Sequence, residues 1–177
     1  MKKLLFLLML TLLSGCASNV EDEYADVPAF FRFTPVPSAA PLYQALNNPG
    51  IFCKIWFQSN TIYFRNAQGV SATATKTALY NYQSIEFISG FIVGTPSLSN
   101  VSGAFYQVAY DLCCPTCYDE SYIQRSLDFD SNEVMKCSRC GRTYDLMNGG
   151  IILSGGQGSK LKQYHLTYGG DVMVISN

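Results

Sequence analysis

Histidine is almost absent from this chain of 177 residues, because His165 is the only one. A single histidine leaves no convincing Ser-His-Asp triad, and His165 is best interpreted as a half-exposed strand residue, not a metal ligand. Charged residues are also scarce, at 14%. The 12 Lys and Arg residues form no cluster, which excludes the basic footprint of a nucleic-acid-binding protein. The sequence therefore gives no support for a catalytic activity of its own or for a nucleic-acid partner.

An apolar run long enough to span a bilayer is missing too. The run over residues 4–13 follows Lys2 and Lys3 and is shorter than the ~20 residues that a spanning helix needs, so it fits the apolar region of a secretory signal. Leu-Ser-Gly-Cys closes the run and resembles the lipobox of bacterial lipoproteins. The resemblance implies that residues 1–15 are a signal peptide and that Cys16 carries a lipid anchor for a membrane. The alternative is an ordinary secretory signal with an incidental cysteine.

The segment after Cys16 has the composition of a tether. Residues 17–23 are polar and acidic, which favours a flexible chain. They resemble the acidic export signal of some Bacteroidetes lipoproteins, which implies the bacterial cell envelope, at the surface or the periplasmic face of the outer membrane. Four prolines in residues 27–41 indicate extended chain. We therefore predict a lipidated tether and Pro-rich linker over residues 16–39, and one folded domain over residues 40–177.

The rest of the chain favours β-structure. Twelve Tyr and 11 Phe with little charge are typical of a β-rich globular domain. No segment has a sustained helical period with caps, and residues 42–46 predict only a single helical turn. Short apolar or alternating segments between turn residues predict an all-β domain. We expect strands at residues 51–57, 61–65, 84–93, 104–113, 161–168 and 171–175, and a strand or hairpin at residues 128–136. Ser59 and Asn60 predict a hairpin turn between the first two strands, and Gly169 and Gly170 predict one between the last two.

The cysteines carry the clearest chemistry. Two Cys-x-x-Cys pairs lie within residues 112–157, with nineteen residues between them. Their members, which we call the cysteine tetrad, are Cys114, Cys117, Cys137 and Cys140. Two intervening residues let both sulfurs of a pair reach one ion from a tight turn, and Gly141 lets backbone amides turn toward a sulfur. Four thiolates suit Zn²⁺ in a closed structural site, a single iron, or a [2Fe–2S] cluster.

Disulfides are the alternative to a metal, because export leads to an oxidising compartment. Six cysteines remain after lipidation, an even number. Two Cys-x-x-Cys turns favour the metal interpretation. Cys53 and Cys113 are left over; Cys113 adjoins the first pair, so it either forms a disulfide with Cys53 or substitutes for a ligand.

The residues around the tetrad resemble the cluster-binding loops of Rieske domains, in particular those of Rieske-like lipoproteins of Bacteroidales. The run 137–150 is similar to the second loop, Cys-x-x-His-Gly-x-x-Phe/Tyr-Asp followed by a glycine turn, and residues 154–156 take the place of the covering loop. Residues 160–164 and 169–175 are similar to the returning strand and the last hairpin. The resemblance implies Rieske-like stacked antiparallel sheets with a two-loop metal subdomain like that of rubredoxins and zinc ribbons. It also places Tyr144 over the metal centre.

The ligands depart from the Rieske pattern, which takes one cysteine and one histidine from each loop. Cys114 and Cys137 match the two cysteines, whereas Cys140 replaces one histidine and Thr116, beside Cys117, stands at the other. A standard Cys₂His₂ centre is therefore excluded, and thiolates in place of imidazoles lower the potential. We expect zinc or a [2Fe–2S] cluster on four cysteines. Electron transfer to an unknown redox or envelope partner is one role, and a structural or ligand-binding module is the alternative.

Overall fold

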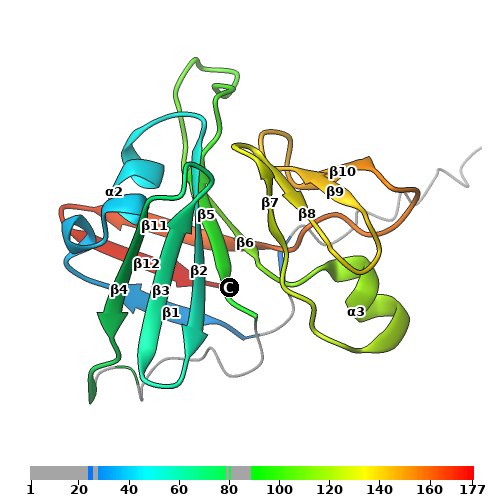
Figure 1. Cartoon of the computed structure of the whole chain (residues 1–177). Helices are drawn as coiled ribbons and strands as arrows, with labels where there is room; N and C mark the ends of the chain where they lie inside the picture. Colours follow the sequence, from blue (N-terminus) through cyan, green and yellow to red (C-terminus); the bar gives the residue numbers. More distant parts are fainter. Residues whose placement is uncertain (1–23, 26–27, 79, 81–88) are drawn as a thin grey trace, which may run out of the picture.

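The computed structural model of the chain describes residues 24–25, 28–78, 80 and 89–177 (Figure 1). The predicted signal peptide, Cys16 and the acidic tether lie outside these residues, as does half of the strand predicted over residues 84–93. Within the described part of the chain, no helix combines the length and the apolar character needed to cross a membrane.

Strands dominate the fold and form two antiparallel sheets, which confirms the all-β prediction (Figure 1). The larger sheet has eight strands in the spatial order β1-β12-β11-β6-β5-β2-β3-β4. Its strands are β1 (Phe30–Phe33), β2 (Ile51–Gln58), β3 (Thr61–Asn66), β4 (Ser71–Thr75), β5 (Phe91–Thr95), β6 (Val108–Asp111), β11 (Gln163–Gly169) and β12 (Val172–Ser176).

The smaller sheet has four strands in the order β10-β9-β8-β7 and lies to one side of the larger one (Figure 1). Its strands are β7 (Asp128–Ser131), β8 (Val134–Lys136), β9 (Thr143–Asp145) and β10 (Ile151–Ser154). Three short helical elements complete the described fold: η1 (Val36–Ser38), α2 (Ala40–Asn47) and α3 (Pro115–Ser121). α2 lies against the larger sheet, whereas α3 lies beside the smaller one.

The predicted hairpins are confirmed. β2 pairs with β3 around Ser59 and Asn60, β7 pairs with β8, and β11 pairs with β12 around Gly170. Gly170 has φ +63, the left-handed conformation that its tight turn requires. The strand predicted over residues 104–113 is shorter than expected, because only Val108–Asp111 pairs with neighbours and the residues before it are exposed.

The predicted linker boundary at residue 40 is wrong. Residues 30–33 form β1, which pairs with β12 at the edge of the larger sheet. Phe31 and Phe33 alternate inward and are buried. Pro28 and Pro35 flank the strand instead of interrupting it, and an edge strand tolerates neighbouring proline best. The folded part of the chain therefore begins before the proline-rich segment ends.

Two hydrophobic cores lie on opposite faces of the central strands, because successive side chains of a strand point to opposite faces. All five residues of β5 are buried for this reason. The first core, which we call the large core, includes Phe31, Leu42, Ile55, Phe64, Phe91, Val93, Tyr164 and Ile175. The second, which we call the small core, consists of Phe52, Ile92, Val108, Tyr110, Leu112, Cys114, Cys117, Leu127, Met135, Cys137, Tyr144, Leu146 and Leu161.

A buried cation also joins the two sheets. Lys54 on β2 is only 8% exposed, and its Nζ lies 3.0 Å from a carboxylate oxygen of Asp128 on β7. Arg65 on β3 binds the same oxygen at 2.6 Å. Partial burial raises the pKa of Asp128, but the hydrogen bonds from Arg65 and Lys54 outweigh it and hold that pKa below its ordinary value. Asp128 therefore fixes the start of the smaller sheet against the larger one.

Candidate metal centre

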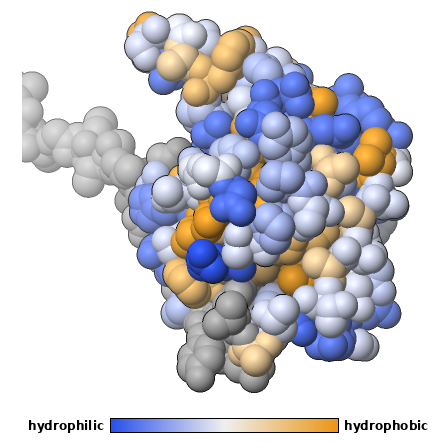
Figure 2. All heavy atoms as spheres, turned by 90° about the vertical axis from the view of Figure 1, so that its left-hand side faces the viewer, coloured by the Kyte–Doolittle hydropathy of each residue, from blue (hydrophilic) through white to orange (hydrophobic). Residues whose placement is uncertain are grey.

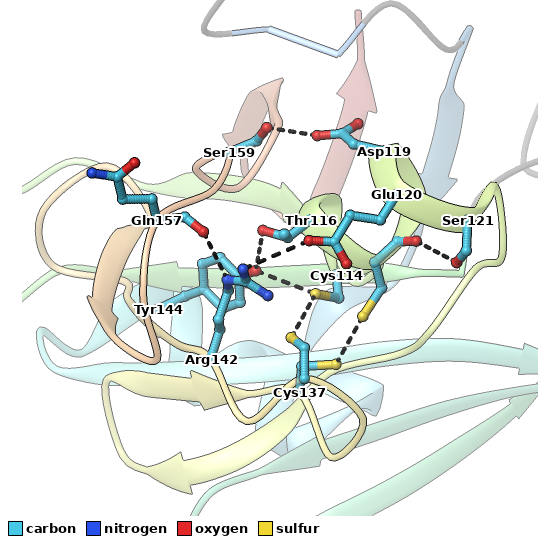
Figure 3. A network of polar contacts seen from close by, with 12 residues as sticks. Cys114, Thr116, Asp119, Glu120, Ser121, Cys137, Arg142, Tyr144, Gln157 and Ser159 are labelled. Atoms are coloured by element: carbon cyan, nitrogen blue, oxygen red, sulfur yellow. Dashed lines mark hydrogen bonds and ion pairs between the residues drawn. The ribbon is translucent and has the colours of Figure 1, made fainter.

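Two segments that are distant in the sequence bring the cysteine tetrad together. Cys114 is the N-cap of α3, and Cys117 lies in its first turn. Cys137 and Cys140 come from the turn between β8 and β9, which is closed by a hydrogen bond from Gly141 N to Cys137 O. The four sulfurs all lie within 4.8 Å of one another (Figure 3). The predicted metal-ligating residues thus form one cluster.

The sulfur separations fit a single tetrahedral ion. Cys114 Sγ lies 3.7 Å from Cys140 Sγ, and Cys117 Sγ lies 3.7 Å from Cys137 Sγ. A metal–sulfur bond of about 2.3 Å gives a tetrahedron whose edges are about 3.8 Å. A [2Fe–2S] cluster places two irons and two sulfides between its pairs of thiolates, which spreads them further apart. The donor set present here therefore fits one ion better than a two-iron cluster.

None of the six described cysteines forms a disulfide. The separations in the tetrad are far longer than the ~2.05 Å of a sulfur–sulfur bond. The disulfide considered between Cys53 and Cys113 is not formed either. Cys53 faces the large core and pairs in register with Val93 on β5, and Val93 pairs with Ala109 on β6. Cys113 therefore lies two strands away from Cys53 and four residues further along the chain than Ala109. This separation is too long for a disulfide, and Cys113 also stays outside the tetrad.

Burial shapes the protonation of the thiols. Cys114, Cys117 and Cys137 are buried, whereas Cys140 is half-buried. Burial raises the pKa of Cys114 to about 11 and raises the pKa of Cys117 further. Burial also acts on Cys140, but hydrogen bonds from the backbone and side chain of Arg142 outweigh it and lower its pKa to about 7. A metal ion that binds here has to displace protons from the buried thiols.

Tyr144 and Thr116 form a hydrogen-bond chain that ends on a ligand. The hydroxyl of Tyr144 lies 3.2 Å from Cys114 Sγ and 3.2 Å from Thr116 Oγ1 (Figure 3). A metal-bound Cys114 would be a thiolate, which can only accept a hydrogen bond, so the Tyr144 hydroxyl would then donate to this sulfur and accept from Thr116. Both side chains are buried. The chain fixes the orientation of the sulfur and offsets part of its negative charge.

Arg142 brings a positive charge to the tetrad. Its guanidinium lies against Cys140, and its Nε donates to Gln157 O at 3.0 Å (Figure 3). Its terminal nitrogen lies 3.7 Å from Glu120 on α3. Four thiolates around a divalent ion leave a net negative charge, which a neighbouring guanidinium stabilises. The hydrogen bond to Gln157 ties the loop after β10 to the site. Gly155 in the same loop packs closely on Arg142, since a Cβ added at Gly155 would lie 2.7 Å from the Cα of Arg142.

His165 takes no part in this site. It lies exposed on β11, and its ring stacks on Tyr24 with the centroids 4.1 Å apart. The tetrad contains only cysteines, which agrees with the exclusion of a Cys₂His₂ centre.

A half-buried carboxylate lies just upstream of the tetrad. Asp111 accepts hydrogen bonds from Tyr164 OH at 2.9 Å and from the backbone N of Cys113 at 2.7 Å. Burial raises the pKa of Asp111 to about 6, although both hydrogen bonds favour its charged form. The folded protein therefore holds a proton on Asp111 that the unfolded chain releases at lower pH.

We expect Asp111→Asn to remove a pH-dependent loss of stability. The pKa of Asp111 in the folded protein lies above the unfolded value of about 3.9. Protonated Asp111 therefore stabilises the folded state at low pH, and this contribution is lost as pH rises to about 6. The free energy of unfolding should fall by an amount on the order of 3 kcal/mol over that range. Urea unfolding at several pH values between 4.5 and 7, for both proteins, measures the difference. Asn keeps an acceptor for both hydrogen bonds, so parallel stability curves would contradict the assignment.

Comparison of the chain with protein-family models, curated proteins and solved structures finds no match to any of them. The assignment of the site therefore depends on its own geometry. Sequence reasoning located the four cysteines of the tetrad but missed α3 and the contacts of Thr116 and Arg142. Pro115 directly after Cys114 is the signal for α3, since proline favours the first helical position. The contacts of Thr116 and Arg142 depend on tertiary packing that no local pattern reveals.

Proposed function

We propose that this chain is a lipid-anchored protein of the bacterial cell envelope whose β domain is stabilised by one zinc ion bound to the cysteine tetrad. The observation that supports zinc most directly is the pair of 3.7 Å sulfur separations within a cluster no wider than 4.8 Å. Four cysteines complete the coordination of the ion and leave no open position for a substrate. The proposed role of the metal is therefore structural.

The position of the tetrad supports a structural role as well. It joins the start of α3 to the turn between β8 and β9, and three of its cysteines belong to the small core. β8 and β9 are only three residues long, so strand pairing alone contributes little to holding the smaller sheet in place. A bound ion would supply the missing cross-link.

The envelope location and the family relation are proposals from the sequence. The lipobox-like residues ending at Cys16 support lipidation, and residues 17–23 would then connect the lipid to the domain. Seven residues extend to about 25 Å at most, which would hold the domain close to the membrane. The loop sequences around the tetrad support a Rieske-like scaffold that has exchanged its histidine ligands for cysteine.

A second candidate is a single iron on the same ligands that transfers electrons. The half-buried Cys140 favours it, because an electron would leave through the most exposed ligand. Its redox partner would then dock beside Cys140 and Arg142. Zinc, which has no redox chemistry, would make this role impossible.

Metal analysis of the chain from Ala17 distinguishes these candidates, since every described element lies in residues 24–177. We expect one zinc per chain in a colourless protein purified without chelators. Cys113→Ala, next to the tetrad but outside it, should keep the metal, whereas Cys137→Ser should lose it. Iron without sulfide would favour the second candidate, and iron with sulfide a cluster. Absence of both metal and free thiols would mean disulfides and would refute the site.

A further inference from the structure

The larger sheet leaves a seam between its two edges. β1 and β4 are the first and last strands in its spatial order, yet residues of both line one cavity of about 380 Å³. We call this space the seam cavity; its lining includes Phe33, Ile62, Ala74, Arg32 and Tyr80. On the side of the molecule with α2 and β4, Figure 2 shows small groups of apolar atoms set between hydrophilic ones. The cavity size is within the range typical of small-molecule sites.

The walls of the seam cavity combine apolar and polar groups. Phe33 and Ile62 belong to the large core, and Ala74 packs against it from β4. The hydroxyls of Thr34 and Ser38 come from the chain between β1 and α2. The tetrad belongs to the small core, on the other face of the central strands, so the seam cavity is a separate site.

Tyr80 gives the cavity an unsatisfied polar group. Its hydroxyl is buried and has no hydrogen-bond partner in the described part of the chain. Leaving a buried hydroxyl unpaired destabilises the folded state, so native proteins pair such groups in nearly all cases. A ligand oxygen inside the cavity would satisfy the Tyr80 hydroxyl.

The charge of the lining favours an anionic oxygen. Arg32 is its charged residue, and none of the described residues that line the cavity is acidic. Lys76 adds a second positive charge nearby, with its Nζ 4.9 Å from the centroid of the Tyr80 ring. The positive charge of these two side chains attracts a carboxylate more strongly than a neutral oxygen.

We propose that the seam cavity binds a small monocarboxylate with an apolar body, of the size of a medium-chain fatty acid. The apolar body lies against Phe33, Ile62 and Ala74. The carboxylate lies toward Arg32 and accepts a hydrogen bond from Tyr80. The bound carboxylate then supplies the hydrogen-bond acceptor that the buried Tyr80 hydroxyl lacks.

Calorimetric titration of the zinc-loaded chain from Ala17 tests this with octanoate and, as a neutral probe of the same length, 1-octanol. We expect octanoate to bind one to one and 1-octanol at least about tenfold more weakly. Arg32→Gln should weaken octanoate about tenfold or more, as loss of a hydrogen bond to a charged group predicts, and leave 1-octanol unchanged. Tyr80→Phe should weaken octanoate several-fold.

Filling the cavity provides the second arm. Ala74→Leu should abolish binding of both probes, whereas Thr73→Leu, on the exposed side of β4 and outside the lining, should leave binding unchanged. The zinc content of every variant should equal that of the parent, so failure here does not bear on the metal site. Equal affinity for the two probes, undiminished binding to Ala74→Leu, or no binding of octanoate at millimolar concentration would overturn the proposal.

Discussion

Removal of the proposed metal ion is expected to unfold the smaller sheet while the larger sheet stays folded. The tetrad contributes three buried cysteines to the small core and none to the large core. Structural zinc sites bind with an apparent free energy of about 10–16 kcal/mol near pH 7, which equals or exceeds the whole stability of a typical domain. Loss of the ion would also leave sulfurs packed against each other in an apolar site.

Hydrogen exchange measured by mass spectrometry resolves this outcome, because it reports each region separately. After chelation, or in Cys137→Ser, backbone amides of β8 and β9 should exchange fast, and those of β2 and β3 should stay protected. Addition of zinc should restore protection to the chelated protein but not to Cys137→Ser. Cys113→Ala is the matched control and should behave like the parent. Uniform loss of protection in both sheets, or no loss in either, would show that the site does not stabilise the smaller sheet selectively.

Replacement of Cys16 by alanine is expected to abolish membrane attachment. The proposed anchor depends on one thiol, since the lipobox-like sequence offers no second attachment point. Each buried methylene of an attached lipid contributes about 0.8 kcal/mol to the free energy of membrane binding. A protein that carries more than one acyl chain therefore stays on the membrane, and the unmodified protein does not. The effect should therefore be all-or-none.

Detergent phase partitioning and the intact mass of the mature protein measure this effect. The parent should enter the detergent phase and carry a lipid mass on an N-terminal Cys16, and Cys16→Ala should lack that mass. The control is Cys53→Ala, which removes a buried thiol of the large core and should keep the lipid. A Cys16→Ala protein whose mature form still partitions with the detergent would show that the anchor lies elsewhere.

The cysteine tetrad was predictable because the geometry of each pair is local. In a Cys-x-x-Cys turn, the spacing itself brings the two sulfurs together, and the glycine at Gly141 with φ +75 closes the second turn. The hairpins were predictable for the same reason, since turn residues and alternating side chains lie next to each other in the sequence.

The elements that were missed depend on contacts between distant residues. β1 has only four residues between prolines, and its stability comes from pairing with β12 at the other end of the chain. α3 has seven residues, too few for a helical period to show. β9 has three residues and β10 has four, and both pack against the small core. Propensity is a weak guide for such segments because packing decides their conformation.

The pairing of β1 with β12 brings the two ends of the larger sheet's chain segment next to each other. Phe30 pairs in register with Ser176, and Ala29 N donates to the side chain of Asn177 at 3.0 Å. A short linker from Asn177 back to the start of β1 would therefore join neighbours, and new ends could be opened in an exposed loop such as that around Val101 without cutting either core. For an anchored protein, the same geometry means that a reporter fused after Asn177 would sit beside the point where the tether enters the sheet.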